Sequence, residues 1–167
     1  MARYSLSWVS ITPTATTDTT GLANGTYFGV IQGGSTTQLV DVREVSMDGE
    51  SASTSAPAVI LLARDSTVAG TLVAGTTFNA ILDALAVAPS VVPLTGNSAT
   101  TLPQRSATGH LLNLGFNAYG GIMKWRGEGD ECPTLFGNTA ALGELSLSAY
   151  TGGTPGPVSG HVIYEPR

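Results

Sequence analysis

Few side chains in this chain are suited to acid–base or nucleophilic chemistry: two histidines, His110 and His161, and one cysteine, Cys132. Each histidine lies in a stretch where apolar and polar residues alternate, which is typical of a structural position in a strand. Cys132 would need a basic partner to act as a nucleophile, but the charged residues just before it, within 128–131, are all acidic. We therefore expect no catalytic residues and a protein that is not an enzyme.

The main cluster of charges, KWRGEGDE at residues 124–131, does not have the spacing of a metal site. A calcium loop needs oxygen ligands at closely alternating positions, and GEGDE offers some of these without the EF-hand spacing. The sequence has no His-X-His or CxxC pairing, and its glycine-rich stretches at Gly33 and Gly152 lack the lysine of a phosphate loop. We expect no metal, no cofactor, and an exposed loop that makes ion pairs between subunits, because Trp125 and Arg126 are residue types enriched at interfaces.

The cations are scattered: seven Lys and Arg residues never form a run, and the net charge is −5. Affinity for nucleic acid and for anionic membranes depends on clustered cations, so we expect no direct nucleic acid contact and no membrane contact. The start, MARYSLSWVSITP, has no apolar segment of signal-peptide length, which predicts synthesis in a cytoplasm. A single cysteine excludes an intramolecular disulfide.

The elements that must position these side chains are short strands. Residues that favour strands alternate with polar ones in short runs, separated by Gly, Pro, Asn and Ser/Thr clusters. In YSLSWVSI, Tyr4, Leu6 and Trp8 alternate with serines, whereas the unbroken apolar run in AVILLAR predicts a strand covered on both faces. About eight strands are expected, at 4–11, 26–32, 38–47, 58–64, 109–119, 122–125, 143–150 and 158–164.

The stretch 66–105 lacks this regularity and is rich in Ala, Thr, Gly and Pro. Within it, Phe78, Ile81, Leu82 and Leu85 recur at helical spacing after Thr77, a residue type that caps helices. The spacing predicts a short helix inside an irregular insertion. The alternative is a loop with buried hydrophobic residues.

The length suits a single domain, residues 1–167, with one sizeable core. Short strands with turn signals and no βαβ rhythm predict an all-β fold, an antiparallel β-sandwich of jelly-roll type. The pair Gly120-Gly121 predicts a hairpin between its flanking strands, and the terminal strand is expected to pair at a sheet edge near the first strand.

Because only 11% of residues are charged, uncharged polar side chains must cover the surface, which suits either a protein packed against neighbours or a rigid β domain facing water.

Four segments together resemble one known family. RYSLSWVSITPTATTD is a strand with an aromatic residue before a Thr-rich segment, and MDGESASTSAPAVILLARDSTVAG is an acidic, Ser/Ala-rich turn before an apolar strand that ends in Arg. LNLGFNAYGGIMKW carries Phe-Asn and a small hinge, and LGELSLSAYTGGTPGPVSGHVIYEPR has Ser-Gly before a closing strand. In this order they resemble the capsid decoration, or cement, proteins of tailed double-stranded-DNA phages. The chain departs from that pattern at 69–104, which is longer and more apolar, and at GEGDECPTLFG.

The resemblance implies a jelly-roll-like structural virion protein that binds the outer surface of a phage capsid and stabilises it. Its partner would be the major capsid protein, and it would act as a homotrimer on the virion after synthesis in the host cytoplasm. Contacts are expected within 3–11, 65–104 and 125–136, with these candidate residues: Arg3, Tyr4, Trp8, Trp125, Arg126 and Phe136. The alternative is a carbohydrate- or receptor-binding jelly-roll module of a virion, such as a fibre or spike tip.

Overall fold

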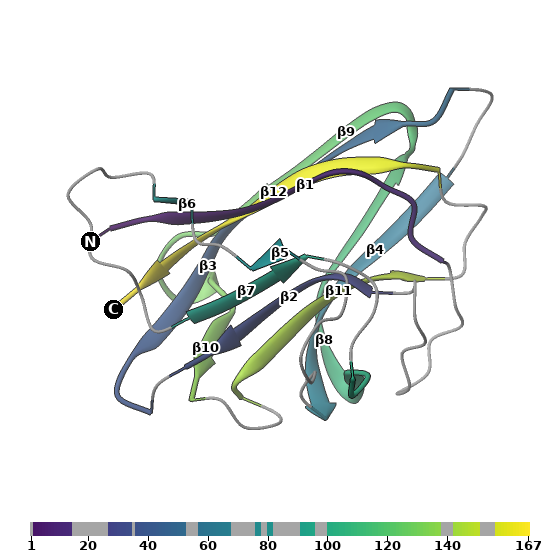
Figure 1. Cartoon of the computed structure of the whole chain (residues 1–167). Helices are drawn as coiled ribbons and strands as arrows, with labels where there is room; N and C mark the ends of the chain where they lie inside the picture. Colours follow the sequence, from purple (N-terminus) through teal and green to yellow (C-terminus); the bar gives the residue numbers. More distant parts are fainter. Residues whose placement is uncertain are drawn as a thin grey trace.

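The computed structural model describes residues 2–14, 27–34, 36–52, 57–67, 76–77, 80–81, 91–95, 100–137, 142–150 and 156–167. These residues form two antiparallel sheets that pack face to face (Figure 1). The predicted all-β sandwich is thereby confirmed. Within these ranges, no helix is long and apolar enough to span a bilayer.

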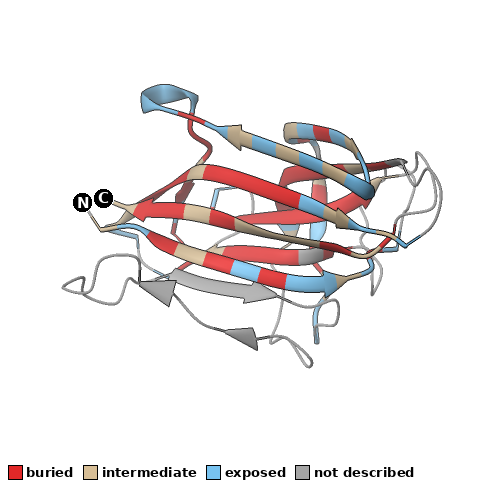
Figure 2. Cartoon of the chain, turned by 90° about the horizontal axis from the view of Figure 1, so that it is seen from above, coloured by how far each residue is buried: buried red, intermediate tan, exposed pale blue. Residues whose placement is uncertain are grey.

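The first sheet combines strands from both ends of the chain. Its order is β10-β3-β12-β1-β6, and β9 pairs with β3 beside β10. Its strands are β1 (Tyr4–Ile11), β3 (Leu39–Glu50), β6 (Ala80–Ile81), β9 (Tyr119–Arg126), β10 (Thr134–Phe136) and β12 (Val158–Pro166), and the short 3-10 helix η1 (Gly129–Glu131) lies between β9 and β10. Because β1 and β12 are antiparallel neighbours, the two termini lie side by side at one end of the sheet (Figures 1 and 2).

The second sheet has the order β5-β7-β2-β11-β4-β8. Its strands are β2 (Tyr27–Gly33), β4 (Pro57–Thr67), β5 (Thr76–Thr77), β7 (Val91–Thr95), β8 (Gln104–Asn117) and β11 (Glu144–Tyr150). As its apolar run predicts, β4 is covered on both faces. Ile60 points into the core and Leu61 points to the other side, and neither is more than 2% exposed.

Eight strands of this sandwich have the order of a jelly roll. They run β1-β12-β3-β9 across one sheet and β2-β11-β4-β8 across the other. These eight are the strands that the sequence predicts, seven from runs of alternating residues and β4 from its unbroken apolar run. The short strands β5, β6 and β7, which come between β4 and β8 in the chain, extend the sheets at their edges.

The core fills the space between the sheets. Period-2 alternation turns Leu6, Met47 and Val162 of the first sheet toward Leu62 and Leu147 of the second. The rings of Tyr4 and Tyr164 stack across β1 and β12 with their centroids 5.8 Å apart. Truncating one such buried leucine to alanine costs roughly 2–5 kcal/mol, so this apolar layer is a principal stabilising element.

The sequence predicts an edge position for the closing strand β12. In the structure, β12 is central in its sheet. It pairs with β1 on one side and with β3 on the other. Its inner residues Val158, Val162 and Tyr164 are fully buried. The expected edge position is wrong because β3 continues the sheet beyond β12.

The predicted hairpin at Gly120-Gly121 is also wrong. β8 pairs with β4 in the second sheet and β9 pairs with β3 in the first. The chain crosses between the sheets at Ala118, which is fully buried and whose carbonyl oxygen accepts a hydrogen bond from the Ser51 N–H at 2.8 Å. A small residue makes this corner, and both glycines lie within β9.

The predicted helix is not formed at the positions that can be compared. Thr77, the expected cap, lies in β5, and Ile81 lies in β6. Thr77 pairs with β7 and Ile81 pairs with β1, so sheet pairing replaces the helical turn at both positions. Phe78, Leu82 and Leu85 lie outside the described residues.

Candidate functional site

The outer face of the first sheet exposes side chains on its flanking strands, such as Ser7 and Lys124, while Glu44 and Ser46 at its centre are only 8% exposed. Since alternate residues of β1, β12 and β3 point into the core, the residues between them point outward. Strand pairing aligns these residues in rows, of which one is Ser5, Ile163, Glu44 and Arg126 and the next is Ser7, His161, Ser46 and Lys124. Figure 2 views this face from above, and no described element lies over it. We call the outward side chains of β1, β12, β3 and β9 the open face.

Charges gather on the open face and at its end near the termini. Five of the seven cations of the chain lie there: Arg3, Arg43, Lys124, Arg126 and Arg167. They are scattered along the sequence, and the pairing of β1, β12, β3 and β9 brings them together. The sequence alone shows no run of cations, so this concentration of charge was missed.

Glu44 is the centre of one group of ion pairs on the open face. Its Oε1 lies 2.8 Å from Nζ of Lys124 and 2.9 Å from Nε2 of His161. Burial raises the pKa of Glu44, but the hydrogen bonds and positive charge of these two neighbours outweigh it, so the pKa is below its ordinary value. Glu44 therefore stays ionised and paired at neutral pH.

Arg43 is the centre of a second group. Its guanidinium lies 3.1 Å from Oδ2 of Asp41 and 3.2 Å from Oε2 of Glu165, and it donates a hydrogen bond to Sγ of Cys132 at 3.3 Å. Asp41 also pairs with Arg167, at 3.0 Å. The charges along the middle of the open face are thus largely neutralised by one another.

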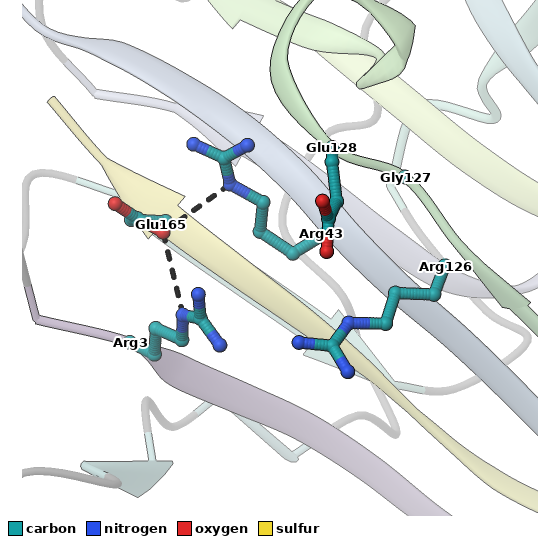
Figure 3. Close-up of a pocket in the computed structure, with 6 residues that line it drawn as sticks. All are labelled: Arg3, Arg43, Arg126, Gly127, Glu128 and Glu165. Atoms are coloured by element: carbon teal, nitrogen blue, oxygen red, sulfur yellow. Dashed lines mark hydrogen bonds and ion pairs between the residues drawn. The ribbon is translucent and has the colours of Figure 1, made fainter.

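A pocket of about 260 Å³ opens beside this second group (Figure 3). Its lining residues are Arg3, Arg43, Arg126, Gly127, Glu128 and Glu165. Arg3 comes just before β1 and pairs with Glu165 through Nε at 3.4 Å, while Arg126 ends β9. Figure 3 shows the guanidinium groups of Arg3 and Arg126 pointing toward one another above β12. Arg126 makes no hydrogen bond or ion pair with any residue in the described part of the chain.

The second sheet carries a different kind of polar cluster on its outer side. Asp65, Arg105, Glu144, Ser146 and Ser148 have no exposed surface. The hydroxyl of Ser146 donates to Oδ1 of Asp65 at 2.6 Å, and Arg105 donates to the hydroxyl of Ser148 at 3.1 Å. Because these side chains are enclosed, the cluster supports the fold and offers no surface to a ligand.

Burial and the neighbouring carboxylate shift protonation in this cluster. Burial, followed by the hydrogen bond with Glu144, raises the pKa of Asp65 to about 9, against the opposing effects of Ser146 and Arg105. Burial and the charge of Glu144 likewise raise the pKa of Tyr27 to about 12. Asp65 therefore keeps its proton at neutral pH.

The structure divides the predicted contact residues into two groups. Tyr4 and Trp8 are 3% and 4% exposed and belong to the core, so they are removed from the set of contact residues. Arg3 and Arg126 line the same pocket, Phe136 is 44% exposed at the end of β10, and Trp125 is partly buried against the core. The expected contact segment 65–104 lies mostly outside the described residues.

The three residues considered for catalysis occupy separate places. His110 lies on β8 in the second sheet, His161 lies on the open face, and Cys132 is buried beside Arg43. In the described ranges, no group of three or more His, Cys, Asp or Glu side chains is arranged to hold a metal ion.

No family model, no curated protein and no solved structure matches the chain. Function is therefore inferred from the jelly-roll order of the strands, the open face and its arginine-lined pocket.

Proposed function

We propose that this protein is a decoration protein of a tailed-phage capsid, which binds the outer surface of the assembled shell as a trimer and stabilises it. The order of the four sequence segments that resemble this family supports the proposal, and so does the jelly-roll strand order, which recurs in viral capsid domains. One fold hosts many functions, so the surface of the protein must also fit this role.

The observation that carries the proposal is the open face. It is four strands wide, and its central ions are already paired, as Glu44 is with Lys124 and Arg43 is with Asp41. An ion that keeps its partner when water is removed loses less free energy than an isolated ion. A partner protein can therefore cover this face without leaving a buried, unpaired charge at its centre.

The charge of the chain supports a location on the outside of the shell. The net charge is −5, and the acidic residues Glu128, Asp130 and Glu131 stand beside the open face on and before η1. A surface of this sign repels the phosphates of packaged DNA. It suits the exterior of a capsid, where the partner is protein.

Stabilisation follows from binding that requires the assembled state. A protein that contacts several capsid subunits at once binds the shell more tightly than it binds separated subunits. Binding then lowers the free energy of the intact shell relative to its parts. Three linked copies strengthen this effect, because each copy holds the others at the surface.

The proposal is tested by binding to heads of the virus that encodes the chain. Purified protein is mixed with intact heads, and the bound fraction is measured by sedimentation and by gold labelling in electron micrographs. We expect the protein to sediment with the heads and to label their outer surface. If it remains in the supernatant, or binds a glycan array and not the heads, the proposal is wrong.

A pair of variants locates the binding surface. Ser7→Arg places a long charged side chain on the open face, whereas Asn113→Arg places the same side chain at an exposed position on β8 in the second sheet. We expect the first substitution to abolish sedimentation with heads and the second to leave it unchanged. Equal binding by the two variants would show that the open face is not the contact surface.

A further inference from the structure

The arginine-lined pocket has donors that the chain does not use. Arg3 pairs with Glu165 through Nε alone, so its two terminal nitrogens have no partner in the described part of the chain. The guanidinium group of Arg126 makes no hydrogen bond or ion pair with any residue in the described part of the chain. Each guanidinium carries five N–H donors in a planar fork, so the pocket holds two incompletely satisfied forks.

The guanidinium groups of Arg3 and Arg126 converge on the same pocket. Figure 3 shows the guanidinium groups of Arg3 and Arg126 directed toward one another across β12, with Arg43 and Glu165 beside them. Two cations facing each other repel unless an anion lies between them. Glu165 does not fill this role for Arg126, because its carboxylate pairs with Arg3 and Arg43 instead.

We propose that this pocket binds a carboxylate of the partner protein, an aspartate or glutamate side chain on the surface that the open face covers; the identity of the partner rests on the proposed function. A planar carboxylate matches the arginine fork and accepts two parallel hydrogen bonds from it. The volume of about 260 Å³ accommodates one such side chain with a few waters.

The surroundings favour a protein carboxylate over a nucleic acid. Glu128 and Glu165 line the pocket, and Asp130 and Glu131 follow in η1. A run of phosphates would meet these acidic groups on either side, whereas a single carboxylate needs only the converging arginines. The pocket is also continuous with the open face, since Arg126 stands in the same row as Ser5, Ile163 and Glu44.

A titration with small anions tests the chemistry without any partner. The Nε–Hε signals of the arginines are followed by NMR while sodium propionate, a mimic of a glutamate side chain, is added at constant ionic strength. Sodium phosphate and sodium chloride form parallel titrations. We expect saturable shifts of Arg3 and Arg126 with propionate. Shifts that do not saturate, or that appear equally with chloride or only with phosphate, would overturn the assignment.

Variants test the same site. Arg126→Gln removes one fork and lowers the net charge by one, and Asn113→Asp lowers it by one on β8, away from the pocket. We expect propionate to bind Arg126→Gln about tenfold more weakly and to bind Asn113→Asp as it binds the wild type. Arg126→Lys, which keeps the charge and loses the fork, should recover only part of the affinity. Equal affinity of all three variants would contradict the proposal.

Sedimentation with heads separates this inference from the proposed function. Arg3→Gln/Arg126→Gln should bind heads at least about tenfold more weakly than Asn113→Asp does. If all these proteins bind heads equally, the pocket assignment fails and the decoration function stands. If the wild type binds propionate but not heads, the decoration function fails and the carboxylate pocket stands.

Discussion

At the scale of single residues, the enclosed pair Asp65 and Glu144 has the clearest physical consequence. Both carboxyl groups have no exposed surface, and Glu144 is close enough to raise the pKa of Asp65. Ser146 and Arg105 favour the charged form of Asp65, but burial and Glu144 oppose it more strongly, so its pKa is raised to about 9. One carboxyl of the pair must keep its proton for the cluster to remain buried.

This pair predicts that stability falls as the pH rises. Asp65 has an ordinary pKa of 3.8, so between that value and about 9 the folded state holds a proton that the unfolded state has lost. The stabilisation that this bound proton provides is fully present below pH 3.8. It declines as the pH rises and is lost once the pH passes about 9. We expect the free energy of unfolding in urea to fall by roughly 1 kcal/mol per pH unit in this window.

Asp65→Asn tests the assignment, because an amide resembles the protonated carboxyl. The variant should remain folded at neutral pH and should lose the decline of stability with pH. Asp48→Asn, which changes an exposed carboxylate on β3, is the control and should keep the decline. An identical pH dependence in the wild type and Asp65→Asn would show that this pair does not set it.

Of the interface residues expected from the sequence, two arginines lie at the pocket and two aromatic residues lie in the core. Arg3 and Arg126 were chosen by residue type, and both line the pocket. Tyr4 and Trp8 alternate with serines in β1, and that alternation turns them inward. The period-2 pattern that predicts the strand therefore also argues against an interface role for both. Arg43 was missed because only strand pairing shows which cations meet.

At the scale of elements, the closing strand β12 ties the first sheet together. It pairs along both edges, with β1 and with β3. Gly160 lies where the indole ring of Trp8 crosses it and where the carbonyl oxygen of Ser46 comes close. A Cβ at this position would lie under 3.0 Å from both groups, so glycine is required for close packing rather than for an unusual φ.

Gly160→Ala is expected to destabilise the protein. The added methyl group must displace backbone of β3 or the ring of Trp8, and overpacking of this kind costs roughly 1–3 kcal/mol. The measurement is the free energy of unfolding in urea, monitored by tryptophan fluorescence.

Gly115→Ala is the matched control, since it makes the same change within a strand where nothing lies within 4 Å of the added Cβ. It should be neutral or slightly stabilising. Equal losses of stability in the two variants would show that β12 does not pack as tightly as described.

The sequence predicted the long strands well and their partners poorly. Alternation marks most of the eight long strands, because one face of each must be buried, and the unbroken apolar run marks β4, which is covered on both faces. It does not say which strand lies beside which, so β8 and β9 were paired wrongly. β10 has three residues and β5 and β6 have two each, which is too short for a pattern to show. β7 contains Pro93, a residue that argues against a strand.

At the scale of the whole molecule, the two sheets present different outer sides. At the centre of the second sheet, the outward residues Ser146, Ser148 and Leu61 are enclosed, while its edge strand β8 exposes Asn113. On the first sheet, Ser7 and Lys124 are exposed and the pocket beside them opens outward. The first sheet therefore offers the polar groups that a partner can reach. We therefore expect the open face to lie against the capsid and the second sheet to lie away from it.

This orientation and the proposed trimer are checked by a reconstruction of decorated heads from electron micrographs. Three copies of the 17.0 kDa chain are expected around each occupied position, with the open face inward. Linked copies bind a shell more tightly than single ones, because the first contact raises the effective concentration of the others. Isolated single copies, or the second sheet against the shell, would contradict this arrangement.

The most direct test of the central claim is the temperature at which heads release their DNA. Heads that lack the protein are compared with the same heads after purified protein is added back, and DNA release is followed with an intercalating dye during heating. A decoration protein that stabilises the shell should raise the release temperature by several degrees in the supplemented heads, and Ser7→Arg should not. Release at the same temperature with and without bound wild-type protein would contradict the claim that this chain stabilises a capsid.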